Sequence, residues 1–234
     1  GEISKGYKFV TLEGNSINSL SSSTNSQNSD GSSSTSASTS SETEDINCPS
    51  NYEKIFVSQQ NGNDNSDGKS ESNAIKTLNK AKEIASSSSS DGICILLHGG
   101  EIFNQFTSNT DSRIQEGKRN TFAFIWDQDK ELVFTSYGNG KAILTQPGNA
   151  GSGNPGSAIA VLGITKKVKI SNIEFDKWQS GGIFVRYSEN VEITNNKLDK
   201  IGTKFFNDPK NDDYYGGGVL YIKDSKNIVM NDNE

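Results

Sequence analysis

The chain has little of several residue types that carry recognisable chemistry. Its 234 residues include one histidine, two cysteines and four prolines. Because His98 stands alone, between a buried-strand pattern and Gly99-Gly100, a Ser-His-Asp triad has little scope, and we expect a hydrogen-bonded structural side chain there. Two cysteines cannot by themselves make a zinc site. No apolar run is long enough to span a membrane.

The charge balance excludes one class of partner. The net charge is −6 and there is no basic run, whereas nucleic acids are held mainly by Lys and Arg contacts to phosphate. We therefore expect no nucleic-acid partner.

The two cysteines leave two interpretations open. Cys94 lies in a buried-strand pattern, where a free cysteine acts as a small hydrophobe, and a Cys48–Cys94 disulfide is the alternative if the protein is secreted.

Apolar residues are distributed unevenly along the chain. Residues 19–45 are almost entirely Ser, Thr, Asn, Gln and acidic residues, which cannot bury enough apolar surface to offset the entropy of ordering. We predict a disordered linker there. It would separate residues 1–18, the remnant of an upstream domain, from a domain of residues 46–234 that is truncated at its C-terminus.

The end of the chain repeats itself. Residues 168–178 align with residues 191–201, and residues 190–196 align with residues 227–233. Repeats of this length indicate a solenoid, in which each unit buries its apolar face on its neighbours. Apolar residues alternate within each unit, as Val168 and Ile170 show, so the units are strands. The sequence predicts an all-β parallel β-helix, with Asn196 stacked on Asn233 inside it.

One segment has helical spacing instead. Within residues 74–85, apolar side chains at Ile75, Leu78, Ala81 and Ala85 recur on one face, with Ile84 beside them. We predict an amphipathic helix that covers the open N-terminal end of the solenoid core.

Five blocks carry a family resemblance. Residues 55–68, 74–81, 95–103, 135–143 and 168–175 resemble, in this order, the first coils of pectate-lyase-like, right-handed parallel β-helix proteins. The resemblance implies a right-handed β-helix. It implies less about activity, because this superfamily holds polysaccharide lyases, glycoside hydrolases, epimerases and surface proteins without catalysis.

Strand alternation places a group of side chains on one outer face. If Ile183 and Val185 face the core, Phe184 and Arg186 face outward. An insertion over about residues 203–215 emerges beside the same face. Aromatic rings stack on sugar rings and carboxylates hold Ca²⁺. The expected substrate-binding residues are Trp178, Phe184, Tyr214 and Tyr215, and the expected calcium ligands are Asp208, Asp212 and Asp213.

In the lyases that the chain resembles, a Lys or Arg acts as Brønsted base beside a calcium ion. The residues that this resemblance nominates for catalysis are Arg186, Lys223 and Lys177. The alternative is a solvated face with charge pairs along the stack.

Residues 63–68 also partly match a calcium loop. The twelfth position counted from Asn63 holds Ala74 instead of Glu, so tight Asx turns are the preferred interpretation.

These observations give two functional hypotheses. The first is a secreted or cell-surface, monomeric, carbohydrate-active protein, a lyase or glycoside hydrolase acting on a uronate-containing polysaccharide. The second is a non-catalytic surface β-helix that binds glycans.

Overall fold

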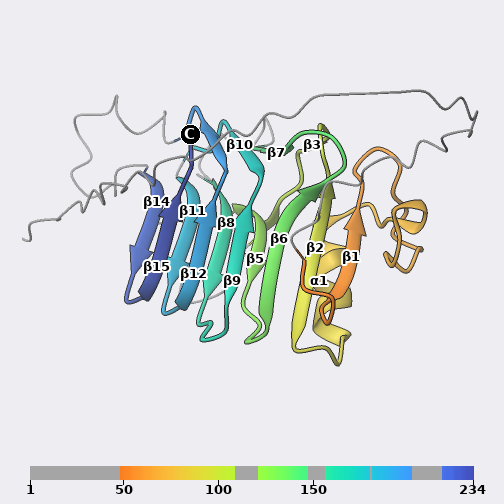
Figure 1. Ribbon diagram of the computed structural model, residues 1–234. Helices are drawn as coiled ribbons and strands as arrows, with labels where there is room; N and C mark the ends of the chain where they lie inside the picture. The colour runs from red at the N-terminus through yellow and green to blue at the C-terminus, as the bar shows by residue number, and fades with distance from the viewer. Residues whose placement is uncertain (1–47, 109–120, 147–155, 180, 202–217) are drawn as a thin grey trace, which may run out of the picture. The chain divides into compact units, whose positions relative to one another are not determined.

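The computed structural model describes residues 48–108, 121–146, 156–179, 181–201 and 218–234 (Figure 1). All described residues belong to one compact unit. The predicted remnant (residues 1–18) and linker (residues 19–45) lie outside the described residues.

Most of the described chain is strand. The strands are β1 (Glu53–Val57), β2 (Gly92–His98), β3 (Ile102–Phe103), β4 (Thr107–Ser108), β5 (Thr121–Trp126), β6 (Glu131–Tyr137), β7 (Ala142–Thr145), β8 (Gly156–Leu162), β9 (Val168–Ser171), β10 (Ile173–Asp176), β11 (Gly181–Arg186), β12 (Glu189–Thr194), β13 (Lys197–Asp199), β14 (Gly218–Lys223) and β15 (Lys226–Asn231). The helical elements are η1 (Glu71–Asn73) and α1 (Leu78–Ser87).

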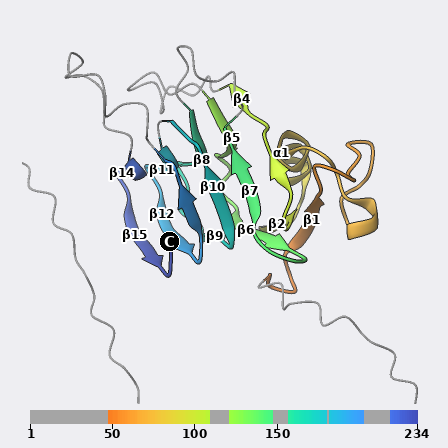
Figure 2. The same cartoon turned by 90° about the horizontal axis from the view of Figure 1, so that it is seen from above.

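The strands form three sheets, and within each sheet the strands of successive coils stack along one common axis (Figures 1 and 2). Sheet A has the order β1-β2-β6-β9-β12-β15, sheet B has β13-β10-β7-β3, and sheet C has β14-β11-β8-β5-β4. Except for the antiparallel pair β4–β5, the paired strands are parallel. The chain visits the sheets in turn, as in β9, β10 and β11, and we call one such circuit a coil. The described chain is therefore a β-helix-like solenoid.

The repeat alignment made from the sequence matches the strand register. Val168 pairs with Val191, and Val191 pairs with Ile228 in the next coil. Phe175 likewise pairs with Leu198. Because equivalent residues of successive coils stack directly, the inward positions of all coils form one continuous core. Its largest fully buried members are Trp126, Trp178, Phe103, Phe124, Phe134 and Phe175.

Left-handed residues mark the corners between sheets. Asn172, Asn195 and Asp232 have positive φ at successive A-to-B corners, and Asn190 and Asn227 have it at the second residues of β12 and β15, just after the C-to-A corners. Asn and Asp tolerate this conformation because their short polar side chains bond to nearby backbone. The corner chemistry thus explains much of the Asn and Asp content of the repeats.

The predicted asparagine stack is present. Asn196 is fully buried, and its Nδ2 donates to Asn233 Oδ1 at 3.1 Å and to the carbonyl of Ile170 at 3.0 Å. Its Oδ1 accepts from the amide of Ile173 at 3.0 Å. The side chain therefore satisfies backbone groups of neighbouring coils inside the solenoid.

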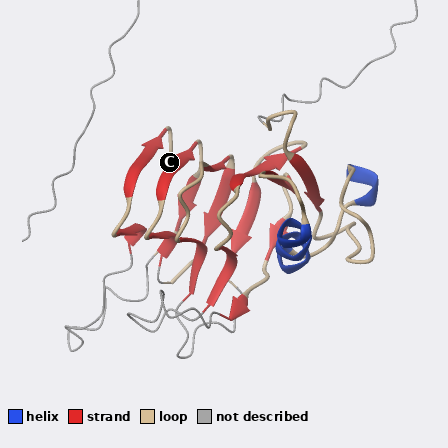
Figure 3. Ribbon diagram, turned by 90° about the horizontal axis from the view of Figure 1, so that it is seen from below, coloured by secondary structure: helices blue, strands red, loops and turns tan. Residues whose placement is uncertain are grey.

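Helix α1 begins later than the sequence predicted. The helix starts at Leu78, with Thr77 Oγ1 accepting from the amide of Lys80 at 3.1 Å, and Ile75 instead forms a parallel bridge with Val57. The cause is Asp64, whose Oδ1 accepts from the amides of Lys76 and Thr77 at 2.8 and 2.9 Å and keeps them outside the helix. Leu78, Ala81 and Ala85 join the core. Figure 3 shows α1 at the β1 end of the stack.

The segment around Asp64 consists of Asx turns. The amide of Asn65 donates to Asn63 Oδ1, and the amide of Lys69 donates to Asp67 Oδ1, each at 3.0 Å. These side chains bind their own backbone, as the turn interpretation predicted.

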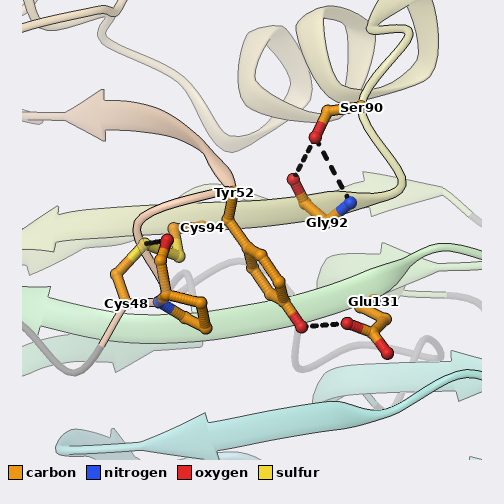
Figure 4. Close-up of a disulfide and its surroundings, with 7 residues drawn as sticks. Cys48, Tyr52, Ser90, Gly92, Cys94 and Glu131 are labelled. Atoms are coloured by element: carbon orange, nitrogen blue, oxygen red, sulfur yellow. Dashed lines mark hydrogen bonds between the residues drawn. A yellow bond between two sulfur atoms is a disulfide. The ribbon is translucent and has the colours of Figure 1, made fainter.

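Cys48 and Cys94 form a disulfide, with Cα atoms 6.2 Å apart (Figure 4). Cys94 is fully buried on the outer face of sheet A, in an apolar layer with Phe56 and Leu96. Tyr52 lies beside the bridge and donates to Glu131 (Figure 4). Its ring occupies the space above Gly92, where a Cβ atom would lie 2.4 Å from Tyr52 Cδ1. The disulfide therefore holds a short covering segment against sheet A.

Candidate functional site

The outer face of sheet C carries its own apolar cluster. Along β11, Ile183 and Val185 belong to the main core, whereas Phe184 belongs to a separate cluster on the other face. Its other members are Phe122, Ile125, Ala160 and Leu162, with Tyr221 packed against them. The predicted alternation along β11 is therefore confirmed.

Two pairs of side chains stack across β11 and β14. The rings of Phe184 and Tyr221 are parallel within 4°, with centroids 4.7 Å apart. Two residues further along each strand, Arg186 pairs in register with Lys223. Because side chains two apart on a strand share a face, an aromatic pair and a cationic pair lie side by side. We call Phe184, Arg186, Tyr187, Tyr221 and Lys223 the sheet C site.

Tyr187 completes this site at the end of β11. Its φ is 51°, at the corner position where Gly163 and Asp224 stand in neighbouring coils. A bulky residue is uncommon in this conformation, and such strain gathers at functional positions. Arg186 Nη2 donates to the Tyr187 hydroxyl at 3.0 Å, and the guanidinium carbon lies 4.8 Å from the ring centre.

The members of the site differ in exposure. Phe184 and Arg186 are only 2% and 3% exposed. Tyr221 and Lys223 are partly exposed, and Tyr187 is 45% exposed. A ligand would therefore meet Tyr187, Tyr221 and Lys223 first, with Phe184 and Arg186 behind them.

Lys177 lies apart from this site. It follows β10, whereas Arg186 ends β11, so the whole length of β11 separates the two residues. Lys177 Nζ instead lies 2.6 Å from Asp176 Oδ2, and Lys200 Nζ lies 2.6 Å from Asp199 Oδ2 in the next coil. The Lys200 hydrogen bond lowers the pKa of Asp199, and Asp199 in turn raises the pKa of Lys200. The structure thus brings together two of the three nominated cations, Arg186 and Lys223.

Trp178 does not face outward, so its predicted place on the binding face is wrong. The side chain is fully buried in the core, and its Nε1 donates to the carbonyl of Leu144 at 2.9 Å. The cause is the left-handed backbone of Lys177, with φ 59°, which interrupts strand alternation and turns the next side chain inward. Trp178 is a packing residue.

The predicted insertion residues lie outside the described residues. These are Tyr214 and Tyr215, expected to bind substrate, and Asp208, Asp212 and Asp213, expected to bind calcium. Within the described part of the chain, no group of three His, Cys, Asp or Glu residues could hold a metal ion.

Two residues of the sheet C site were missed in the sequence. Tyr221 could have been found, because aligning 181–186 with 218–223 sets it beside Phe184. Tyr187 carries no such signal, because only its backbone conformation distinguishes it.

His98 belongs to a polar cluster in the first coils. Its Nδ1 lies 3.3 Å from Glu101 Oε1, and its ring packs edge-on against Tyr137. Glu101 is buried and accepts from Ser58 Oγ at 2.8 Å and from the amide of Gln60 at 3.2 Å. Ser58 thus bonds to the carboxylate and not to the imidazole, which is not the arrangement of an activated nucleophile. The expected hydrogen bond is not found at this atom, because His98 Nδ1 has no hydrogen-bond partner among the described residues.

Comparisons with known proteins place the chain only loosely. No protein-family model matches it, and no curated protein sequence matches it. Among solved structures, it is similar to a GH136 lacto-N-biosidase from Eubacterium ramulus, in its native form and as a selenomethionine derivative. Identity is 14% in both, with TM-scores of 0.37 and 0.36. Each alignment covers 74% of this chain and 40% of the enzyme's length.

The described elements also bear on membrane insertion. None of the helices in the described ranges has the length and apolar character that a bilayer-spanning helix needs.

Proposed function

We propose that the chain is an extracellular β-helix protein that binds a uronate-containing polysaccharide at the sheet C site. The observation that supports this most directly is the register of β11 and β14, which sets Arg186 beside Lys223 and Phe184 beside Tyr221. Arg and Lys form charge-assisted hydrogen bonds with carboxylates, and aromatic faces pack on the apolar faces of sugar rings. The outer face of sheet C therefore offers both cations for the carboxylate and aromatic rings for the sugar ring.

The extracellular assignment rests on the disulfide. Cys48 and Cys94 pair, and disulfides persist in oxidising compartments. We propose a secreted or cell-surface location, with the Ser-rich residues 19–45 as a tether between modules.

The scaffold proposal has three further parts. We propose a right-handed β-helix, because parallel crossovers in one sheet are right-handed in about 98% of cases. We propose that α1 closes the core, because Leu78, Ala81 and Ala85 are buried beside β1 and β5. We also propose that the protein is a monomer.

Catalysis is the second candidate, favoured by the burial of Arg186 next to Lys223. In a β-elimination, a base takes the proton from the carbon beside the uronate carboxylate, a C=C bond forms, and the C–O bond to the leaving sugar breaks. Arginine keeps its proton in proteins, so Arg186 would neutralise the carboxylate, while the unprotonated amine of Lys223 took the proton and water supplied one to the departing sugar oxygen. Charge neutralisation in a buried position is stronger than in water.

The test compares variants on immobilised acidic and neutral polymers. Arg186→Ala and Lys223→Ala should each weaken binding to pectate or alginate by about tenfold or more, the loss expected for a charge-assisted hydrogen bond. Lys200→Ala, an exposed lysine at another corner, is the matched control. Equal binding by all four proteins would overturn the proposal.

The same polymers separate the two candidates. Release of unsaturated ends, seen as near-ultraviolet absorbance and lost in Lys223→Ala, would show a lyase. Binding without such release at any pH would support a non-catalytic glycan-binding protein.

A further inference from the structure

A groove lies at the corner where sheet C passes into sheet A. Its volume is about 470 Å³. The lining residues that matter here are Glu131, Lys166, Lys167, Asn190, Glu192, Asn227 and Val229. None of them belongs to the sheet C site.

An amide ladder runs along this groove. Asn227 Nδ2 donates to Asn190 Oδ1 at 3.1 Å, and Asn190 Nδ2 donates to the carbonyl of Thr165 at 3.0 Å. Both asparagines have left-handed backbones, and both side chains are exposed. The ladder therefore presents polar atoms of three successive coils in a row along the stack axis.

The charges of the groove are balanced. Its two lysines, Lys166 and Lys167, oppose its two glutamates, Glu131 and Glu192. Lys167 Nζ lies 3.5 Å from Glu192 Oε2, and Glu131 accepts from the Tyr52 hydroxyl. Val229, 47% exposed, adds an apolar patch next to Glu192, its neighbour in register. Donors, acceptors and an aliphatic surface thus occur together without net formal charge.

We propose that this groove binds a neutral saccharide chain, separately from the sheet C site. Sugar hydroxyls both donate and accept, which suits amides, lysines and carboxylates set side by side. The C–H face of the sugar would pack on Val229. An acidic polymer would gain no net attraction there, because Glu131 and Glu192 offset the two lysines.

The experiment titrates the whole chain with neutral oligosaccharides of glucose, galactose and mannose, followed by NMR. Asn227→Gly removes the last amide of the ladder and keeps the left-handed backbone, because glycine adopts positive φ freely. Asn195→Gly is the matched control, since Asn195 has φ 52° at the A-to-B corner. Both variants should keep the parent melting temperature within a few degrees.

We expect at least one neutral oligosaccharide to bind, with affinity about fivefold lower in Asn227→Gly and unchanged in Asn195→Gly, as loss of a hydrogen bond predicts. Arg186→Ala should bind it as the parent does, which separates this groove from the proposed uronate site. Absence of binding at millimolar sugar, or equal weakening by both glycine variants, would overturn the proposal.

Discussion

The guanidinium carbon of Arg186 lies 4.8 Å from the ring centre of Tyr187, and Arg186 Nη2 donates a hydrogen bond to the hydroxyl of the same tyrosine. The nearly buried cation therefore holds an exposed ring at a corner where other coils use Gly163 and Asp224. Such an arrangement keeps an aromatic surface in one orientation beside Lys223.

The first prediction concerns this ring. Tyr187→Asn should fold normally, because asparagine tolerates positive φ, but it should bind acidic polymer about fivefold more weakly, as loss of aromatic packing implies. Tyr187→Phe keeps the ring and should lose much less. Polymer-affinity electrophoresis would measure both, and parent-like retention of Tyr187→Asn would show that the ring does not contact the ligand.

The second prediction concerns Trp178. Because the side chain is fully buried and its Nε1 is hydrogen-bonded, Trp178→Ala should destabilise the fold by about 3–5 kcal/mol. Trp178→Phe should cost less, since most of the volume remains. Urea unfolding followed by circular dichroism is the measurement. A cost for Trp178→Ala below about 1 kcal/mol would contradict the buried position.

The third prediction concerns the disulfide. Reductant should lower the melting temperature, because cross-links of this kind contribute about 2–4 kcal/mol. The double variant Cys48→Ser, Cys94→Ala should start from the lower melting temperature and should not respond to reductant. If reductant lowers the melting temperature of both proteins alike, the bridge is not its target.

The fourth prediction concerns pH. Burial, helped by the hydrogen bond to Glu131, raises the pKa of Tyr52 to about 12 from 10.0. The folded state therefore favours the protonated phenol, so its stabilisation is complete below pH 10 and is lost as pH rises from 10 to 12. Thermal unfolding across that window should show a steeper loss for the parent than for Tyr52→Phe. Parallel curves would refute the assignment, because every other titratable group is the same in both proteins.

The sequence predicted the parts of the fold that depend on repetition. Stacked equivalents share the same environment, so aligning residues 168–178 with 191–201 gave the register of sheets A and B correctly. Aligning residues 190–196 with 227–233 paired Asn196 with Asn233. Alternation along β11 likewise placed Phe184 on the outer face.

Local effects of single residues account for the two errors in the sequence-based predictions, the direction of Trp178 and the start of α1. The left-handed conformation of Lys177 reversed the direction of Trp178, and the Asp64 side chain delayed the start of α1. Neither is signalled by residue type, since lysine is not a typical left-handed residue and Asp64 acts on amides distant in sequence. The proposed binding role of Tyr187 likewise depends on a single left-handed backbone position.

Parallel pairing between coils has a consequence for how the chain folds. Val191 pairs with Val168 one coil back and with Ile228 one coil ahead, so no ladder contact of this kind joins neighbouring residues. Each new coil must close a whole loop before its contacts form, which makes nucleation slow. Once one coil is in place, its exposed strand edges template the next, so we expect a lag followed by rapid propagation along the stack.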